Sequence, residues 1–93
     1  MSVVKEMGIS HSEFFRLLPR AMVGFHYHVS GGKVRVSVGD RSVAMELGPE
    51  SVRSIAAMRL PVTKIEFMFS GYTDAEAKAF LDQFDLHFRR GGG

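Results

Sequence analysis

Cysteine is absent from this chain of 93 residues. Its absence excludes disulfides, catalytic thiolates and cysteine-based zinc sites, and it is compatible with a reducing compartment, so we expect a soluble, cytoplasmic protein. Long apolar runs are lacking as well. Charged residues and His11 interrupt the first twenty positions, which predicts that no secretory signal is present, and no segment approaches the length of a membrane span.

A strong excess of one charge is also missing. Twelve Lys and Arg stand against ten Asp and Glu, for a net charge of +2, whereas nucleic-acid-binding domains concentrate positive charge on one face. The sequence contains no glycine-flanked nucleophile, phosphate-binding loop or helical pair of metal ligands. These absences favour a protein that is not an enzyme, and they leave weak nucleic-acid binding only as an alternative.

We expect residues 1–93 to form one domain with flexible ends at 1–8 and 91–93. Sequence signals for the start of a helix occur at three places in it. Capping boxes at residues 10–13 and 73–76 predict helices over 11–18, with one further turn to Ala21, and from 74 to about 84. Pro49 and Glu50 suit a helix start, and apolar spacing predicts a helix from there until Pro61 ends it.

Between the helices the apolar residues alternate, which is typical of strands over 23–29, 33–38, 43–47 and 64–70. The first three predict an antiparallel meander. Gly31-Gly32 or Ser30-Gly31 would form the first turn, and a four-residue connection over 39–42 would set Arg35 opposite Glu46. Alternation over 84–90 favours a short last strand over a continued helix.

These elements predict an α+β fold, a two-layer sandwich with an antiparallel sheet of four or five strands and helices on one face, in the order α-β-β-β-α-β-α with an optional final β. The alternation assigns Phe25, Tyr27 and Val29 to the core. It assigns His26 and His28 to the uncovered face of the sheet.

A metal site is one hypothesis for that face. His26 and His28 would lie about 6.5 Å apart between Cα atoms, and His87 or Asp85 of the last strand could supply a third ligand to zinc or a similar divalent ion. Solvated side chains and anion binding are the alternatives. The cations expected to contact a partner or an anion are Lys33, Arg35, Lys64, Arg89 and Arg90.

The chain ends in Arg89-Arg90-Gly91-Gly92-Gly93. This ending resembles the C-terminus of ubiquitin-like proteins and of small sulfur-carrier proteins, in which a glycine tail enters an activating enzyme and its carboxylate is adenylated. The resemblance implies a carrier role for Gly93. The predicted element order departs from the ββαββ pattern of that family.

The interpretation that we favour is a small non-catalytic domain that binds a protein partner or a second copy of itself. Small domains bury a modest share of their surface, and unpaired strand edges are ready sites for another chain. A homodimer formed through a sheet edge or through the open face is therefore expected. Metal or anion binding by His26 and His28, and a carrier role, remain the alternatives.

Overall fold

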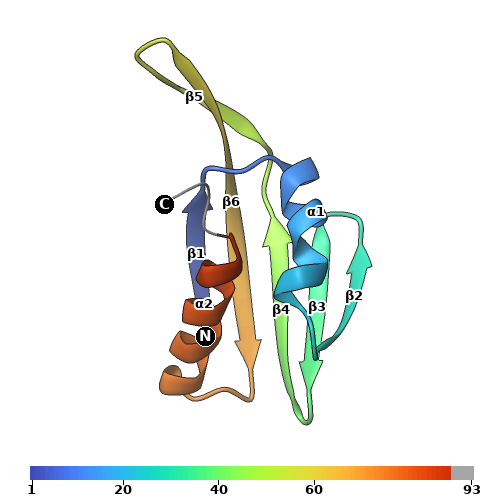
Figure 1. The fold of residues 1–93 in the computed structure, drawn as a ribbon. Coiled ribbons are helices and arrows are strands. Elements are labelled where there is room, and N and C mark those ends of the chain that lie inside the picture. Colours follow the sequence, from blue (N-terminus) through green and yellow to red (C-terminus); the bar gives the residue numbers. More distant parts are fainter. Residues whose placement is uncertain (89–93) are drawn as a thin grey trace.

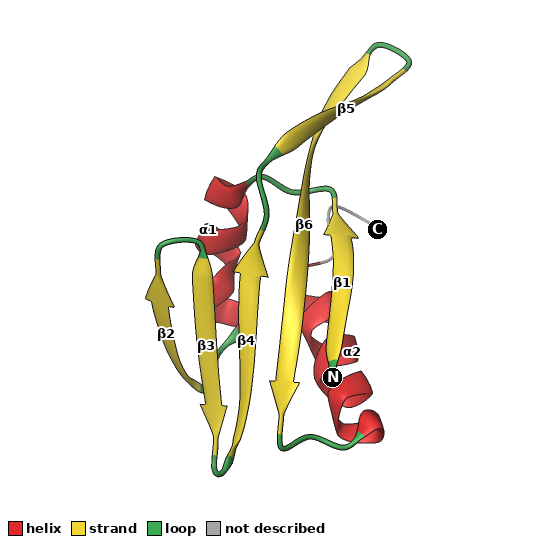
Figure 2. Ribbon diagram, turned by 180° about the vertical axis from the view of Figure 1, so that it is seen from behind, coloured by secondary structure: helices red, strands yellow, loops and turns green. Residues whose placement is uncertain are grey.

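The computed structural model describes residues 1–88. Figures 1 and 2 show an antiparallel sheet with both helices on one face, so the predicted α+β class is confirmed. Residues 1–88 form six strands and two helices, where the sequence predicted four or five strands and three helices. In order, the elements are β1 (Ser2–Met7), α1 (His11–Ala21), β2 (His26–Ser30), β3 (Lys33–Val38), β4 (Arg41–Leu47), β5 (Ser51–Ile55), β6 (Met58–Ser70) and α2 (Asp74–Phe88).

The main sheet has the strand order β1-β6-β4-β3-β2. The thirteen residues of β6 serve two structures. Its second half pairs with β1 and β4 in the centre of the sheet, whereas its first half pairs only with β5. The β5–β6 hairpin therefore leaves the sheet as a two-stranded arm, residues 51–62, which rises beyond the ends of β4 and β1 in both views (Figures 1 and 2).

The core lies between the sheet and the two helices. Ile65 and Phe67 point from β6 toward the helices and are fully buried. The Phe84 ring of α2 packs edge-on against Phe67 at 5.0 Å and stacks on Phe88 at 4.3 Å, and Phe88 in turn stacks on Phe14 of α1 at 5.1 Å. This column of rings joins both helices to the sheet. No helix in the described part of the chain is long and apolar enough to cross a membrane.

Both capping boxes begin helices as predicted. Ser10 Oγ accepts a hydrogen bond from the Glu13 amide at 3.0 Å, and α1 continues to Ala21 although Pro19 lies inside it. At the second box the exchange is reciprocal. The Glu76 amide donates to Thr73 Oγ1 at 3.1 Å and the Thr73 amide donates to the Glu76 carboxylate at 2.9 Å.

The first hairpin has one of the two predicted registers, with Gly31-Gly32 as its turn, Val29 opposite Val34 and His28 opposite Arg35. The second hairpin was predicted wrongly. Its turn has only two residues, Gly39-Asp40, so the pairing is shifted and Arg35 lies opposite Ala44 while Lys33 lies opposite Glu46. Gly39 adopts a φ of 59°, the left-handed conformation that tight hairpin turns require. Because the shift is even, every side chain keeps its predicted face.

The predicted helix after Pro49 was wrong, because residues 51–55 form β5 and residues 58–62 extend the fourth predicted strand backwards into the arm. Val52 and Ile55 are β-branched and suit a strand at least as well as a helix. Pro61 lies opposite Val52 within the hairpin and does not end an element. Cross-strand pairing along this hairpin overrides the helical spacing.

Both ends of the chain also differ from the prediction. Residues 2–7, expected to be flexible, form β1 and pair with residues 63–68 of β6. The last strand was wrong, because α2 continues through Asp85 and His87 to Phe88. Phe88 is four residues beyond Phe84 and extends its stripe, whereas Leu86 is exposed. The predictions for Arg89, Arg90 and Gly91 to Gly93 lie outside the described residues.

The edge strand β2 is the last correction. Tyr27 and Val29 lie opposite Val36 and Val34, so they point toward the core side as predicted. They are not buried, however. Phe25, Tyr27 and Val29 are 37–41% exposed. Tyr27 and Val29 are exposed because β2 is the outermost strand and lies beyond the area that the helices cover (Figure 1), and Phe25 precedes the strand.

Candidate functional site

The side of the sheet without helices, here called the open face, presents side chains from five strands. Figure 2 shows it with both helices behind the strands. Alternation from the buried positions assigns to it Ser2, Val4 and Glu6 of β1, Lys64, Glu66 and Met68 of β6, Ser42, Ala44 and Glu46 of β4, Lys33, Arg35 and Ser37 of β3, and His26, His28 and Ser30 of β2.

His26 and His28 lie exposed on β2, next to a shallow cavity of about 180 Å³. His28 is directly opposite Arg35, so a fixed positive charge adjoins the histidine pair. His87 is exposed on α2, and α2 packs against the other face of the sheet, so this fold does not bring the three histidines together. Among residues 1–88 no group of three or more His, Asp or Glu could hold a metal ion.

The charges of the open face divide between its two halves. Lys33 and Arg35 lie on β3, whereas Glu46 and Glu66 lie opposite each other on β4 and β6. Lys33 Nζ is 3.9 Å from the Glu46 carboxylate. The half with the two glutamates also contains Lys64 of β6, directly opposite Glu6 of β1. The open face therefore has a cationic half on β2 and β3 and a mainly acidic half on β4, β6 and β1.

A hollow of about 320 Å³ lies where the two halves meet. Ala44 is the small residue in the row that crosses the sheet from His28 through Arg35 and Ala44 to Met68. Its single methyl group leaves space between the longer side chains of Arg35 and Met68, and both line the hollow. The predicted contact residues Lys33 and Arg35 are thus brought together at this hollow, and Lys64 is not.

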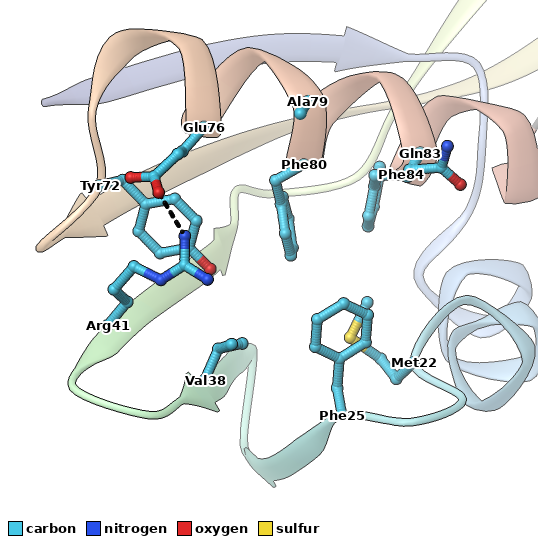
Figure 3. Close-up of a pocket in the computed structure, with 10 residues that line it drawn as sticks. All are labelled: Met22, Phe25, Val38, Arg41, Tyr72, Glu76, Ala79, Phe80, Gln83 and Phe84. Carbon is cyan, nitrogen blue, oxygen red and sulfur yellow. Dashed lines mark ion pairs between the residues drawn. The ribbon is translucent and has the colours of Figure 1, made fainter.

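A second cavity, of about 280 Å³, lies on the helix side between the start of β2 and α2. Figure 3 shows Phe25 pointing from below toward Phe80, and their ring centroids are 6.1 Å apart. The cavity is lined by Met22, Phe25, Val38, Arg41, Tyr72, Glu76, Ala79, Phe80, Gln83 and Phe84. The walls are mostly apolar, and sequence reasoning missed the cavity because it placed Phe25 inside the core.

The charged side chains at the polar end of this cavity, Arg41 and Glu76, form an ion pair with each other. The Arg41 guanidinium is 3.1 Å from the Glu76 carboxylate and 4.8 Å from the centroid of the Tyr72 ring (Figure 3). The backbone hydrogen bond from Thr73 holds the pKa of Glu76 below its usual value, and Arg41 acts in the same direction. Burial raises the pKa of Tyr72, which the charge of Arg41 partly opposes. An occupant would thus meet rings rather than a free charge.

The arm is the feature that the sequence analysis missed most completely. Its apolar side chains have no layer beneath them: Val52 is 56% exposed, Ile55 52%, Met58 61% and Leu60 37%. The only clue was that Val52 and Ile55 are β-branched residues, which suit a strand. The turn at Ala56-Ala57 contains none of the usual turn residues, and Ala56 adopts a φ of 54°, which non-glycine residues rarely do.

The base of the arm is fixed to the rest of the fold. The Gly48 amide donates to the Lys64 carbonyl oxygen at 2.8 Å, and the His11 amide donates to the Glu50 carboxylate at 2.8 Å. Higher up, Arg53 forms an ion pair with Glu6 of β1. The arm therefore leaves the sheet in a defined direction, and the apolar side chains Ile55 and Met58 of its outer part are exposed.

No protein-family model matches this chain, and no curated protein does.

Proposed function

We propose that the protein is a small non-catalytic binding domain that associates with a second copy of itself, and that the arm is its main binding element. The observation that carries the proposal is the exposure of four large apolar side chains on a hairpin that covers nothing. A two-stranded hairpin alone is marginally stable in water, and clustered apolar surface of this kind usually marks an interface.

The shape of the molecule supports this role. The molecule extends 47 Å along its longest axis and 26 Å and 23 Å along the others, and the arm lies at one end of it (Figures 1 and 2). The ion pair between Arg53 and Glu6 and the contacts at Glu50 hold the arm in place before a partner arrives. Preorganisation of this kind lowers the entropy cost of association.

Light scattering on the native chain tests the proposal, together with the double variant Ile55→Ser/Met58→Ser. We expect a mass of about twice 10.3 kDa for the native chain and a monomer for the variant. The matched control is Leu86→Ser, which removes an equally exposed apolar side chain from α2 and should leave the mass unchanged. A native chain that stays monomeric at high concentration would overturn the proposal.

A further inference from the structure

We propose that two copies pack open face against open face, related by a two-fold axis that runs parallel to the strands. This arrangement rests on the proposed self-association and specifies its geometry. It makes a four-layer assembly in which the helices lie outside and the two sheets meet in the middle, a form of sheet packing with spacing of about 10 Å.

The division of charge selects the direction of the axis. An axis parallel to the strands and above β4 places β3 of one copy over β6 of the other, because the sheet order is β1-β6-β4-β3-β2. An axis across the strands would instead place β3 over β3 and repeat like charges. Complementary potentials favour the first arrangement, since like charges facing each other across an interface are costly.

The register brings specific opposite charges to the same level. Lys33, Glu46 and Glu66 form one row across the sheet. With the axis above β4, Lys33 of each copy faces Glu66 of the other, and the contact occurs twice. Glu46 lies near the axis and faces Glu46 of the other copy there, and this repulsion is offset because each Glu46 retains its own Lys33 at 3.9 Å. Glu66 forms no ion pair with another of residues 1–88, so a partner's lysine would supply its counter-charge.

The centre of the face is shaped for the same contact. The next row along the sheet contains Arg35, Ala44 and Met68. Met68 of one copy falls over Arg35 on β3 of the other, at the edge of the hollow of about 320 Å³ that Ala44 leaves beside Arg35. A methionine side chain is flexible and polarisable, and it fills irregular spaces of this kind well.

The arm continues the same surface. Arg53 forms its ion pair with Glu6, an open-face residue. Leu60 lies opposite Arg53, and Ile55 lies opposite Met58 two positions further along the hairpin. Residues two apart on a strand share a side, so Ile55, Met58 and Leu60 belong to the open-face side of the arm. A two-fold axis along the strands leaves both arms at the same end of the dimer, where these apolar sides meet.

The area is sufficient only if the arms take part. Five strands of about six residues make a face of roughly 24 by 20 Å, so two such faces would bury about 1,000 Å². Stable protein interfaces bury about 1,200–2,000 Å². The sheet contact alone therefore falls short, and the apolar sides of the two arms supply the remainder.

Charge reversal with mixing tests the arrangement. Lys33→Glu alone would face Glu66 with a like charge, and Glu66→Lys alone would face Lys33 with a like charge, each at two places in the dimer. We expect the dissociation constant of each variant, measured by sedimentation, to rise by about tenfold or more. In a mixture of the two variants, the heterodimer has opposite charges at both places and should regain affinity within about threefold of the native chain.

Lys78→Glu is the control. It changes the net charge by the same amount as Lys33→Glu, but on the outer surface of α2, and should leave association unchanged. Circular dichroism checks that each variant folds. A native dimer whose affinity is unaffected by either reversal, or a mixture no tighter than the single variants, would overturn this arrangement while leaving self-association standing. A native chain that is monomeric would refute the proposed function itself.

Discussion

Replacing Phe88 by Ala should remove a large part of the stability of this fold. Phe88 is 5% exposed and stacks on Phe84 at 4.3 Å and on Phe14 at 5.1 Å. Truncation of a buried phenylalanine costs about 3–5 kcal/mol, and ring pairs of this kind contribute about 0.5–1.5 kcal/mol of such a loss. The total free energy of unfolding of a 93-residue chain is about 5–14 kcal/mol.

Urea unfolding followed by circular dichroism measures the loss, and Leu86→Ala on the same helix is the matched control. Leu86 is 55% exposed, so its truncation should change the free energy of unfolding by less than about 0.5 kcal/mol. If Phe88→Ala does not fold, Phe88→Leu should still fold with a loss of about 1 kcal/mol. Equal losses at positions 86 and 88 would refute the helical placement of this segment, because a solvent-facing Phe88 could not be in the ring column.

Three further substitutions test other parts of the structure. Thr63→Val should cost about 1–3 kcal/mol in urea unfolding, more than Thr63→Ser, because the buried Thr63 hydroxyl donates to the Ile9 carbonyl oxygen at 2.8 Å; equal effects would contradict this bond. Ala56→Gly should relieve the left-handed φ of 54° and so raise the free energy of opening of the arm, measured by hydrogen exchange, by about 1 kcal/mol. Ala57→Gly should not slow the exchange. Unchanged protection in Ala56→Gly would argue against this turn. The pKa of Glu76 is lowered in the fold, so its charge contributes stability that is fully present above its ordinary pKa and is lost as the pH falls through the folded value. Glu76→Gln should therefore be less stable than the native chain at neutral pH and approach it in acid, and a difference independent of pH would exclude the effect.

Local signals predicted the elements that have local causes. The caps at Ser10 and Thr73 predicted where both helices begin, and Gly31-Gly32 was one of the two turns predicted for the first hairpin. The second hairpin was wrong by an even shift, because both registers bury Val36 and expose Arg35. Face assignment is therefore more robust than pairing, and this is why the open face could be predicted while its ion pairs could not.

Contacts between distant segments explain the remaining failures. β1 pairs with residues about sixty positions away, and nothing within residues 1–8 announces such a partner. The β5–β6 arm has apolar residues at spacings that fit a helix or a strand, and a turn without glycine at Ala56. The exposure of Tyr27 and Val29 depends on which strand is outermost. The candidate binding surface combines the arm with the open face. Of these two parts, the sequence predicted only the open face.

Isotope-filtered NMR on a mixture of labelled and unlabelled chains tests the central proposal most directly, because it detects only contacts between copies. The account predicts intermolecular contacts from the methyl groups of Ile55 and Met58, together with contacts from Met68 across the two open faces. A spectrum at millimolar concentration without intermolecular contacts from the arm would contradict it.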